Sequence, residues 1–233
     1  MKFTKERFKT FKNVFDNFTS RTLFKLASQG HFEEPIRPVS IGKESNVFSA
    51  KKGRNRVIIK IYRLEACDFN GMYNYIKYDP RFLHLKPSRR KVIFAWVQRE
   101  FRNLMKAREG GVRVPTPITF LNNILVEEYI GDKYPAPKLK DSTPENLHNF
   151  WQEILENLKK LHKAGLVHAD MSHFNILNHN EKPVLIDFSQ CTPLSNPNSH
   201  EYLERDVRNI CNYMKRLGLK LDKEEVLQDI TVP

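Results

Sequence analysis

Three side chains that carry oxygen atoms stand at spacings that suit phosphoryl transfer. In the stretch VHADMSHFNILNHNEKPVLIDFS, Asp170 lies five residues before Asn175, and Asp187 lies twelve residues beyond Asn175. Phosphoryl transfer needs a carboxylate beside the attacking hydroxyl and oxygen ligands for Mg²⁺. Asp170 fits the first role, and Asn175 and Asp187 fit the second. Each residue alone is better explained as a turn or capping residue, so the prediction depends on the set.

A lysine inside an apolar segment is the second indication. Lys60 lies within VIIKIY, where a buried ammonium group is costly unless it is paired. We expect its partners to be nucleotide phosphates and a carboxylate on the following helix. Glu100 is the first candidate, and Glu109, close to the helix end, is the second. The alternative is a lysine that extends from an edge strand into solvent.

The segments that would hold the nucleotide are less distinctive. The stretch SIGKESNV keeps only Gly42 of a glycine-rich phosphate loop, and Ser40 and Lys43 are further candidate phosphate contacts. No G-x-x-x-x-G-K-[ST] motif occurs, which excludes the other common ATP-binding loop. Backbone groups of Glu128 and Ile130, at the end of an apolar strand, are the candidates for hydrogen bonds to adenine.

The elements that must position these residues follow from hydrophobic periodicity and turn residues. Residues 64–87 have weak periodicity and are interpreted as a long, mobile connection, and residues 131–143 as a linker. Predicted helices lie within residues 3–18 and over Arg21–Gln29, Ser88–Glu109, Pro144–Ala164 and Glu201–Arg216. The helix at Glu201–Arg216 is predicted to be the last one of the chain. Predicted strands are Val39–Ile41, Val47–Ala50, Val57–Tyr62, Ile118–Leu121 and Ile124–Tyr129, with short ones near Ile176–Leu177 and Val184–Ile186.

Composition limits the class of protein. The 233 residues are 40% hydrophobic, which is enough for a core in one domain or in two packed lobes. No apolar run is long enough to span a bilayer, and the first residues lack the apolar stretch of a secretory signal. The three cysteines share no short spacing, which argues against a disulfide framework or a zinc site and favours a reducing compartment, the cytoplasm.

The charge is unevenly distributed. Residues 1–113 hold 26 Lys and Arg against 10 Asp and Glu, a net charge of +16, whereas the remaining residues carry −4 of the overall +12. A local basic cluster lies at the start of the predicted third helix: Lys86, Arg89, Arg90 and Lys91. This asymmetry favours contact with a polyanion such as RNA, although an ordinary solvated surface would also explain it.

The whole set of motifs resembles the RIO family of atypical serine/threonine protein kinases, in the archaeal form of its first subfamily. The resemblance extends in family order from about Phe15 to Leu219. The stretches that carry it are FDNFTSRTLFKLASQG, SIGKESNVFSA, VIIKIYR, CDFNGMYNYIKYDPRF, WVQREFRNLMKAREGGVRVPTP, NNILVEEYIGD, LVHADMSHFNIL, VLIDFSQ and EYLERDVRNI. Two depart slightly from the usual form: SIGKESNV replaces STGKEANV, and MSHFN, with His173 in place of the usual glutamate, replaces LSEYN.

The resemblance implies an α+β, bilobal protein-kinase-like fold with a small antiparallel β N-lobe and a reduced, mostly helical C-lobe. The expected division is a helical extension over residues 1–38, an N-lobe over 39–130 and a C-lobe over 131–233. It also implies that Asp170 accepts the proton, that Asn175 and Asp187 bind Mg²⁺ or Mn²⁺, and that Lys60 contacts ATP. The resemblance further implies that Asp187 accepts phosphate, with an aspartyl-phosphate intermediate as in an ATPase.

The implied partner is the precursor of the small ribosomal subunit, with slow serine autophosphorylation in vitro. After Asp187 the chain reads Phe-Ser-Gln, and the next predicted helix follows too soon for an activation loop and peptide-binding helices. We therefore expect no ordinary peptide groove. The alternative function is a small-molecule phosphotransferase of the aminoglycoside type, which shares the H-x-D-x-x-x-x-N pattern but favours an acidic pocket. An inactive scaffold and a pure RNA-binding module are the remaining alternatives.

Overall fold

The computed structural model describes residues 15–232 of the chain. The helix predicted within residues 3–18 lies mainly outside this range. Helix α1 (Asn17–Ser28) begins at Asp16, whose carboxylate accepts a hydrogen bond from the Thr19 N–H at 2.9 Å. This cap satisfies one of the N–H groups that have no partner inside the helix. Gly30, with φ of 78°, follows the helix and reverses the chain.

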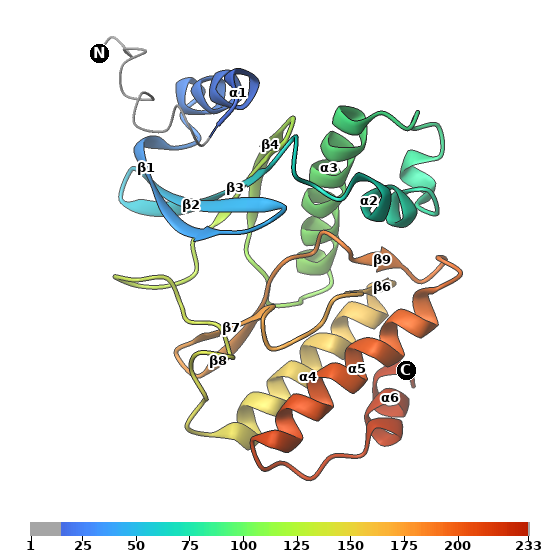
Figure 1. Cartoon of the computed structure of the whole chain (residues 1–233). Helices are drawn as coiled ribbons and strands as arrows, with labels where there is room; N and C mark the ends of the chain where they lie inside the picture. The colour runs from blue at the N-terminus through green and yellow to red at the C-terminus, as the bar shows by residue number, and fades with distance from the viewer. Residues whose placement is uncertain (1–14, 233) are drawn as a thin grey trace.

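An antiparallel sheet in the order β1-β2-β3-β5-β4 forms the upper part of the molecule in Figure 1. Its strands are β1 (Glu33–Ile41), β2 (Ser45–Lys52), β3 (Asn55–Tyr62), β4 (Pro117–Leu121) and β5 (Ile124–Glu128). Strand β1 begins earlier than predicted because Pro35 and Pro38 are tolerated on an edge strand, where a missing N–H breaks no internal ladder.

The two faces of the sheet belong to two apolar clusters. Ile59 and Val126 pack with Leu23 of α1 on one face. Leu125 belongs to the second cluster, together with Trp96 of helix α3 (Arg89–Glu109). Successive side chains of a strand point to opposite faces. Lys60, paired with Leu125 across β3 and β5, therefore lies on the face of the sheet that packs against α3.

Residues 64–87 differ from the featureless connection predicted. They contain α2 (Phe69–Ile76) and the short 3₁₀ helix η2 (Pro80–Phe82), which lie beside α3. Met72 and Ile76 are buried, and the Asp79 carboxylate is fully buried against arginines. Such short elements carry little periodicity of their own because tertiary contacts stabilise them.

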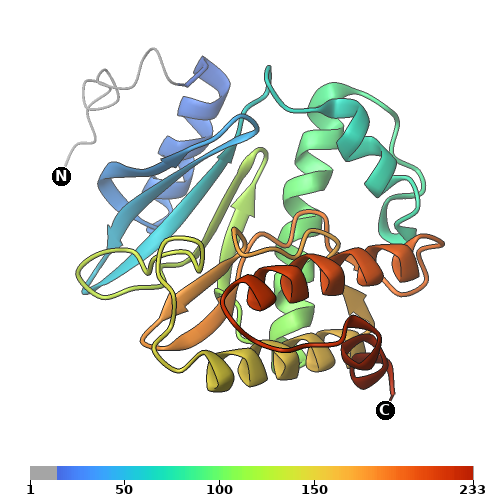
Figure 2. The same cartoon turned by 60° about the horizontal axis from the view of Figure 1, so that its bottom comes forward.

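Helices form most of the second half (Figure 2). They are α4 (Leu147–Lys163), α5 (Ser199–Arg216) and α6 (Lys223–Thr231). Four short strands form two ribbons, β6 (Leu166–Val167) with β9 (Thr192–Pro193) and β7 (Ile176–His179) with β8 (Lys182–Leu185). The prediction that the helix near Glu201–Arg216 is the last one is wrong, since α6 follows it and buries Val226 and Ile230.

None of the helices within residues 15–232 is long and apolar enough to cross a membrane.

Candidate active site

Lys60 lies at the centre of a buried ionic cluster. Its Nζ is 2.8 Å from Glu100 Oε1 and 2.8 Å from Asp187 Oδ1. The hydroxyl of Tyr62 donates to the other oxygen of Glu100 at 2.6 Å, so both oxygens of that carboxylate are engaged. Glu100, the first candidate from the sequence, is therefore the helix residue in contact with Lys60; Glu109, the second candidate, is exposed at the end of α3.

Electrostatics keep this cluster charged. Burial alone would lower the pKa of Lys60, but the carboxylates of Asp187 and Glu100 outweigh burial and raise it well above its ordinary value. Burial raises the pKa of Asp187, whereas Lys60 and the Ser189 hydroxyl lower it, with a net value of about 2. Asp187 is therefore an anion at neutral pH, as a cation ligand or a nucleophile must be.

Asp170 and Asn175 form the second part of the site. The Asn175 side-chain Nδ2 donates to the Asp170 carbonyl at 2.8 Å and to Asp170 Oδ2 at 3.0 Å. Burial and the charge of Asp187 raise the pKa of Asp170, and the bond from Asn175 opposes them. The Asn175 carbonyl accepts from the Ile186 N–H at 3.0 Å, which places Asn175 beside the strand end that carries Asp187.

The Asp170 loop is held from α5 by a residue that the sequence analysis did not single out. Asp206 accepts from the N–H of Ala169 at 2.7 Å and from that of Met171 at 2.8 Å. Arg205 donates to the Ala169 carbonyl, and Ala169 itself has φ of 65°. Asp206 is 1% exposed, and an acidic residue on the buried side of an amphipathic helix is the signal that could have identified it.

The chemistry of the donor set fits a divalent cation. Asn175 uses its Nδ2 as donor, so its amide oxygen is the group left for a metal. Asp187 Oδ1 is held by Lys60 and by the Ser189 hydroxyl at 2.7 Å, while no described residue donates to its Oδ2. Among residues 15–232 no group of three or more His, Cys, Asp or Glu gathers as a metal cage. Two protein oxygens are typical of Mg²⁺, which keeps waters and substrate phosphates as its other ligands.

The turn between β1 and β2 carries the residues predicted to contact phosphate. Burial raises the pKa of Glu44 in this turn, and the charge of Asp187 raises it further. The Gly42 N–H donates to the Ser45 carbonyl at 3.0 Å, and a Cβ on Gly42 would lie 2.8 Å from that oxygen. The turn therefore requires glycine at this position. Ser40 and Lys43 are exposed beside it, and neither has a hydrogen bond or ion pair to the Lys60 cluster.

The other candidate nucleotide contacts follow β5. The Glu128 carboxylate accepts from the Thr116 N–H at 2.9 Å and from its hydroxyl at 2.7 Å, which fixes the strand end. The Ile130 carbonyl accepts from the Ala136 N–H at 2.9 Å. Glu127 was not foreseen as a site residue. It shares the face of Leu125, and burial together with the charge of Glu100 raises its pKa to about 8.

Fold and site together define a kinase-like phosphotransfer protein, and comparisons with known proteins agree. Residues 46–226 match the family model of the RIO domain. The chain is 39% identical over 230 residues to the RIO-type serine/threonine-protein kinase Rio1 of Haloferax volcanii, covering 97% of this chain and 79% of the relative. It is 42% identical over 228 residues to the protein of the same description from Methanocaldococcus jannaschii, with 97% and 78% covered.

A solved structure is similar in fold. The crystal structure of the Rio2 kinase–ADP/Mg²⁺–phosphoaspartate complex from Chaetomium thermophilum superposes with a TM-score of 0.66 at 20% identity, covering 90% of this chain and 65% of the other. The chain belongs to the RIO family of serine/threonine protein kinases, enzymes that use ATP and a divalent cation. The predicted α+β, kinase-like fold is confirmed, and the curated relatives favour a protein kinase over the aminoglycoside-type alternative.

Proposed function

We propose that this chain is a cytoplasmic kinase and ATPase that binds ATP with Mg²⁺ and acts in maturation of the small ribosomal subunit. The observation that carries the catalytic part is the Lys60 ammonium, 2.8 Å from both Glu100 and Asp187 and buried in the cluster. An ammonium group has three donors, and the two carboxylates occupy two of them. The third is available to a phosphate oxygen.

The remaining nucleotide contacts are assigned by position. Ser40, Gly42 and Lys43 cover the phosphates from the β1–β2 turn, and the backbones of Glu128 and Ile130 contact adenine. Asn175 and Asp187 hold Mg²⁺, with Mn²⁺ as a substitute, since both offer the oxygen ligands that these ions prefer. When bound, the cation neutralises negative charge on the transferred phosphoryl group.

The acceptor is Asp187 itself. Its carboxylate oxygen attacks the γ-phosphorus of ATP, the bond from that phosphorus to the β–γ bridging oxygen breaks, and ADP leaves. The aspartyl phosphate then loses its phosphoryl group to water or to a serine or threonine hydroxyl. Asp170 takes the proton of that nucleophile, and the pKa of Asp170, which burial raises, suits a general base.

The ribosomal role is supported by charge and by the family resemblance. Residues 1–113 carry a net charge of +16, and a basic surface of this kind suits the phosphates of precursor ribosomal RNA. We assign residues 39–130 to the N-lobe and 131–233 to the C-lobe, with 1–38 as an extension whose last residues, from Glu33 on, already belong to strand β1 of the N-lobe sheet. The basic half is then the extension and most of the N-lobe, and the acidic C-lobe faces away from RNA.

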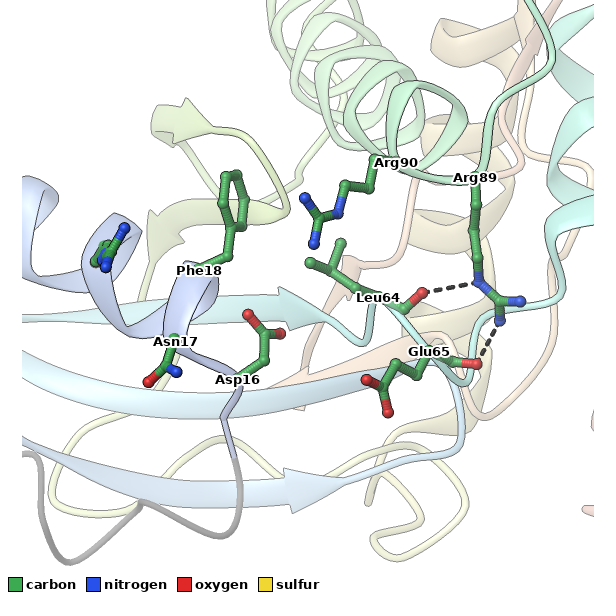
Figure 3. A pocket seen from close by; sticks show the side chains of 8 residues that line it. Asp16, Asn17, Phe18, Leu64, Glu65, Arg89 and Arg90 are labelled. Carbon is green, nitrogen blue, oxygen red and sulfur yellow. Dashed lines mark hydrogen bonds between the residues drawn. The ribbon is translucent and has the colours of Figure 1, made fainter.

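One residue of the basic cluster also has a structural role. The Arg89 guanidinium donates to the carbonyls of Leu64 and Glu65 (Figure 3) and to that of Cys67. These bonds fix the start of the connection to α3. Arg90 lies over the ring of Phe18, with its guanidinium carbon 5.3 Å from the ring centre, and is exposed. The contact with RNA is therefore best tested at Lys86, Arg90 and Lys91, where a substitution leaves these backbone bonds in place.

The catalytic assignment predicts the effect of Asp187→Asn. ATP turnover should fall at least about a hundredfold, roughly 2.7 kcal/mol of barrier, because the change removes a metal ligand and the acceptor together. Steady-state release of inorganic phosphate measures it, circular dichroism checks the fold, and Asp141→Asn, an exposed aspartate on the linker, is the matched control. Turnover within about tenfold of wild type would remove Asp187 from the mechanism.

A further inference from the structure

One helix holds the backbone that follows Asp187. Residues 188–191 have no helix or strand of their own, yet all four carbonyl oxygens accept hydrogen bonds from two side chains of α3. These bonds are Asn103 Nδ2 to Phe188 O at 3.1 Å and to Cys191 O at 2.7 Å, Arg99 Nη1 to Ser189 O at 2.7 Å, and Arg99 Nη2 to Gln190 O at 3.4 Å. Each backbone carbonyl of the four residues after Asp187 is thus hydrogen-bonded to a side chain of α3.

The connection between β3 and α3 completes this arrangement. Asp79 and Arg99 are both 0% exposed, and Arg99 Nε lies 3.1 Å from Asp79 Oδ2. Arg81 bridges Asp79 and Asn103, since its Nη2 lies 2.6 Å from Asp79 Oδ2 and 2.8 Å from Asn103 Oδ1. A buried guanidinium needs a carboxylate partner, so Asp79 is what allows Arg99 to stay charged beside the carbonyls.

These four residues, Asp79, Arg81, Arg99 and Asn103, form one hydrogen-bonded cluster on the backbone of residues 188–191, which we call the clamp. The same helix also carries Glu100, whose carboxylate holds Lys60. Lys60 and the Ser189 hydroxyl meet on one oxygen, Asp187 Oδ1. Helix α3 therefore acts on Asp187 by two routes, one through Lys60 and one through the backbone of residues 188–191.

We propose that Asp79, Arg99 and Asn103 are positioning residues that hold Asp187 in the geometry for binding the cation and accepting phosphate. The inference rests on the proposed function, because it assumes that Asp187 has those roles. A clamp of this kind takes the place of a mobile activation segment: the backbone after Asp187 is fixed by the connection, and anything that displaces Asp79 releases it.

A positioning role of the clamp residues can be distinguished from a role in stability alone. The apolar residues of α3, among them Val92, Ile93 and Leu104, already anchor the helix in the core. A buried ion pair adds little stability compared with apolar residues of similar volume, and replacing it by such residues is often neutral. The carbonyls of residues 188–191, in contrast, have these side-chain donors only as long as Arg99 and Asn103 are present. The two roles are therefore separable by substitution.

Two variants test the clamp. Asn103→Ala removes two carbonyl bonds and keeps the ion pair, and Asp79→Leu with Arg99→Met replaces the ion pair by apolar side chains. Arg102→Ala is the matched control, since Arg102 is exposed on the same helix and contacts the connection through the Phe82 ring. The readouts are Mn²⁺ affinity of the ADP complex by electron paramagnetic resonance, ATP turnover, metal-free ADP affinity and melting temperature.

We expect both clamp variants to bind Mn²⁺ at least about tenfold more weakly and to turn over ATP correspondingly more slowly, with metal-free ADP affinity within about twofold of wild type. The double variant Asp79→Leu with Arg99→Met should have a melting temperature close to that of wild type, but its Mn²⁺ affinity should still be lowered. Mn²⁺ affinity and turnover like those of wild type in both variants, with only the melting temperature lowered, would overturn the clamp. Absence of metal-dependent turnover in the wild-type protein would instead overturn the proposed function.

Discussion

His168 shows how a single buried residue ties stability to pH. It is 1% exposed, packs edge-on against Phe188, and its Nε2 lies 3.1 Å from the Ile186 carbonyl. A carbonyl only accepts, so Nε2 carries a proton. Its Nδ1 is buried and has no partner among the described residues. A second proton there would have no acceptor, and burial accordingly lowers the pKa of His168 to about 4.

This predicts an acid-sensitive fold. Between pH 6.5 and pH 4 the unfolded chain binds a proton at His168 that the folded chain does not, so stability present at neutral pH is lost as the pH falls. The loss reaches about 2–3 kcal/mol near pH 4.5. Urea unfolding of wild type and His168→Gln at pH 7.5 and 4.5 measures this loss. Glutamine is chosen because its side-chain amide can still donate to the Ile186 carbonyl but does not titrate.

Wild type should lose about 2–3 kcal/mol more than His168→Gln over this interval, and His148→Gln, an exposed control on α4, should behave like wild type. Equal losses in wild type and His168→Gln would mean that other groups account for the acid sensitivity.

At the scale of elements, the contact between β3 and α3 is the unit that carries Lys60. Because Glu100 acts through Lys60, the effects of substituting the two residues on kcat/KM for ATP should not be additive in free energy. We expect Lys60→Ala to lower kcat/KM for ATP by about a hundredfold or more and Glu100→Ala by about tenfold. The double variant should be no worse than Lys60→Ala alone.

Steady-state kinetics of the four proteins in this cycle measure the coupling. Glu109→Ala is the control, since Glu109 is an exposed carboxylate on the last turn of α3 and should leave kcat/KM unchanged. If the effects of Lys60→Ala and Glu100→Ala multiply, the two residues act independently, and the ion pair contributes nothing to ATP use.

Elements with a pattern of their own were predictable from the sequence. Helix α3 and strands β3 and β5 agree with the predictions to within two residues at each end, because their apolar spacing and flanking glycines are local signals. Helix α2 and η2 were missed, since their order depends on Asp79 and on packing against α3. The two-residue strands β6 and β9 carry no periodicity at all.

At the scale of the whole molecule, residues far apart in sequence build the site, and this limited the prediction. Lys60, Asp170, Asn175 and Asp187 were proposed from the sequence because their residue types and spacing form a motif. Arg99 could not be found in this way. It lies 90 residues before Ser189, whose carbonyl it holds, and only the packed structure brings the two together. Asp206 was missed although its place on the buried side of the amphipathic helix α5 was a usable signal.

The charge asymmetry predicts how the molecule meets RNA. Lys86, Arg90 and Lys91 are exposed, and charge reversal of all three should weaken binding to small-subunit precursors at low salt. The slope of log affinity against log salt should become shallower by slightly under one unit for each phosphate that is no longer neutralised. Filter binding across salt concentrations measures this slope. Arg89 is left unchanged because it holds backbone carbonyls.

A triple variant of Lys51, Lys52 and Arg54, exposed residues around the β2–β3 turn, controls for net charge. If the two triple variants have the same affinity and slope, the cluster at the start of α3 is ordinary solvated surface. ATP turnover should be normal in both.

In the proposed mechanism the γ-phosphoryl group of ATP passes through Asp187. Rapid-quench single turnover with γ-labelled ATP follows that group, by measuring label in protein-bound acyl phosphate, inorganic phosphate and phosphoserine or phosphothreonine. We predict hydroxylamine-sensitive label on Asp187 first, formed and consumed fast enough to account for turnover, and none of it in Asp187→Asn. Inorganic phosphate or phosphoserine that appears without a preceding acyl phosphate, at the full rate of turnover, would contradict the account.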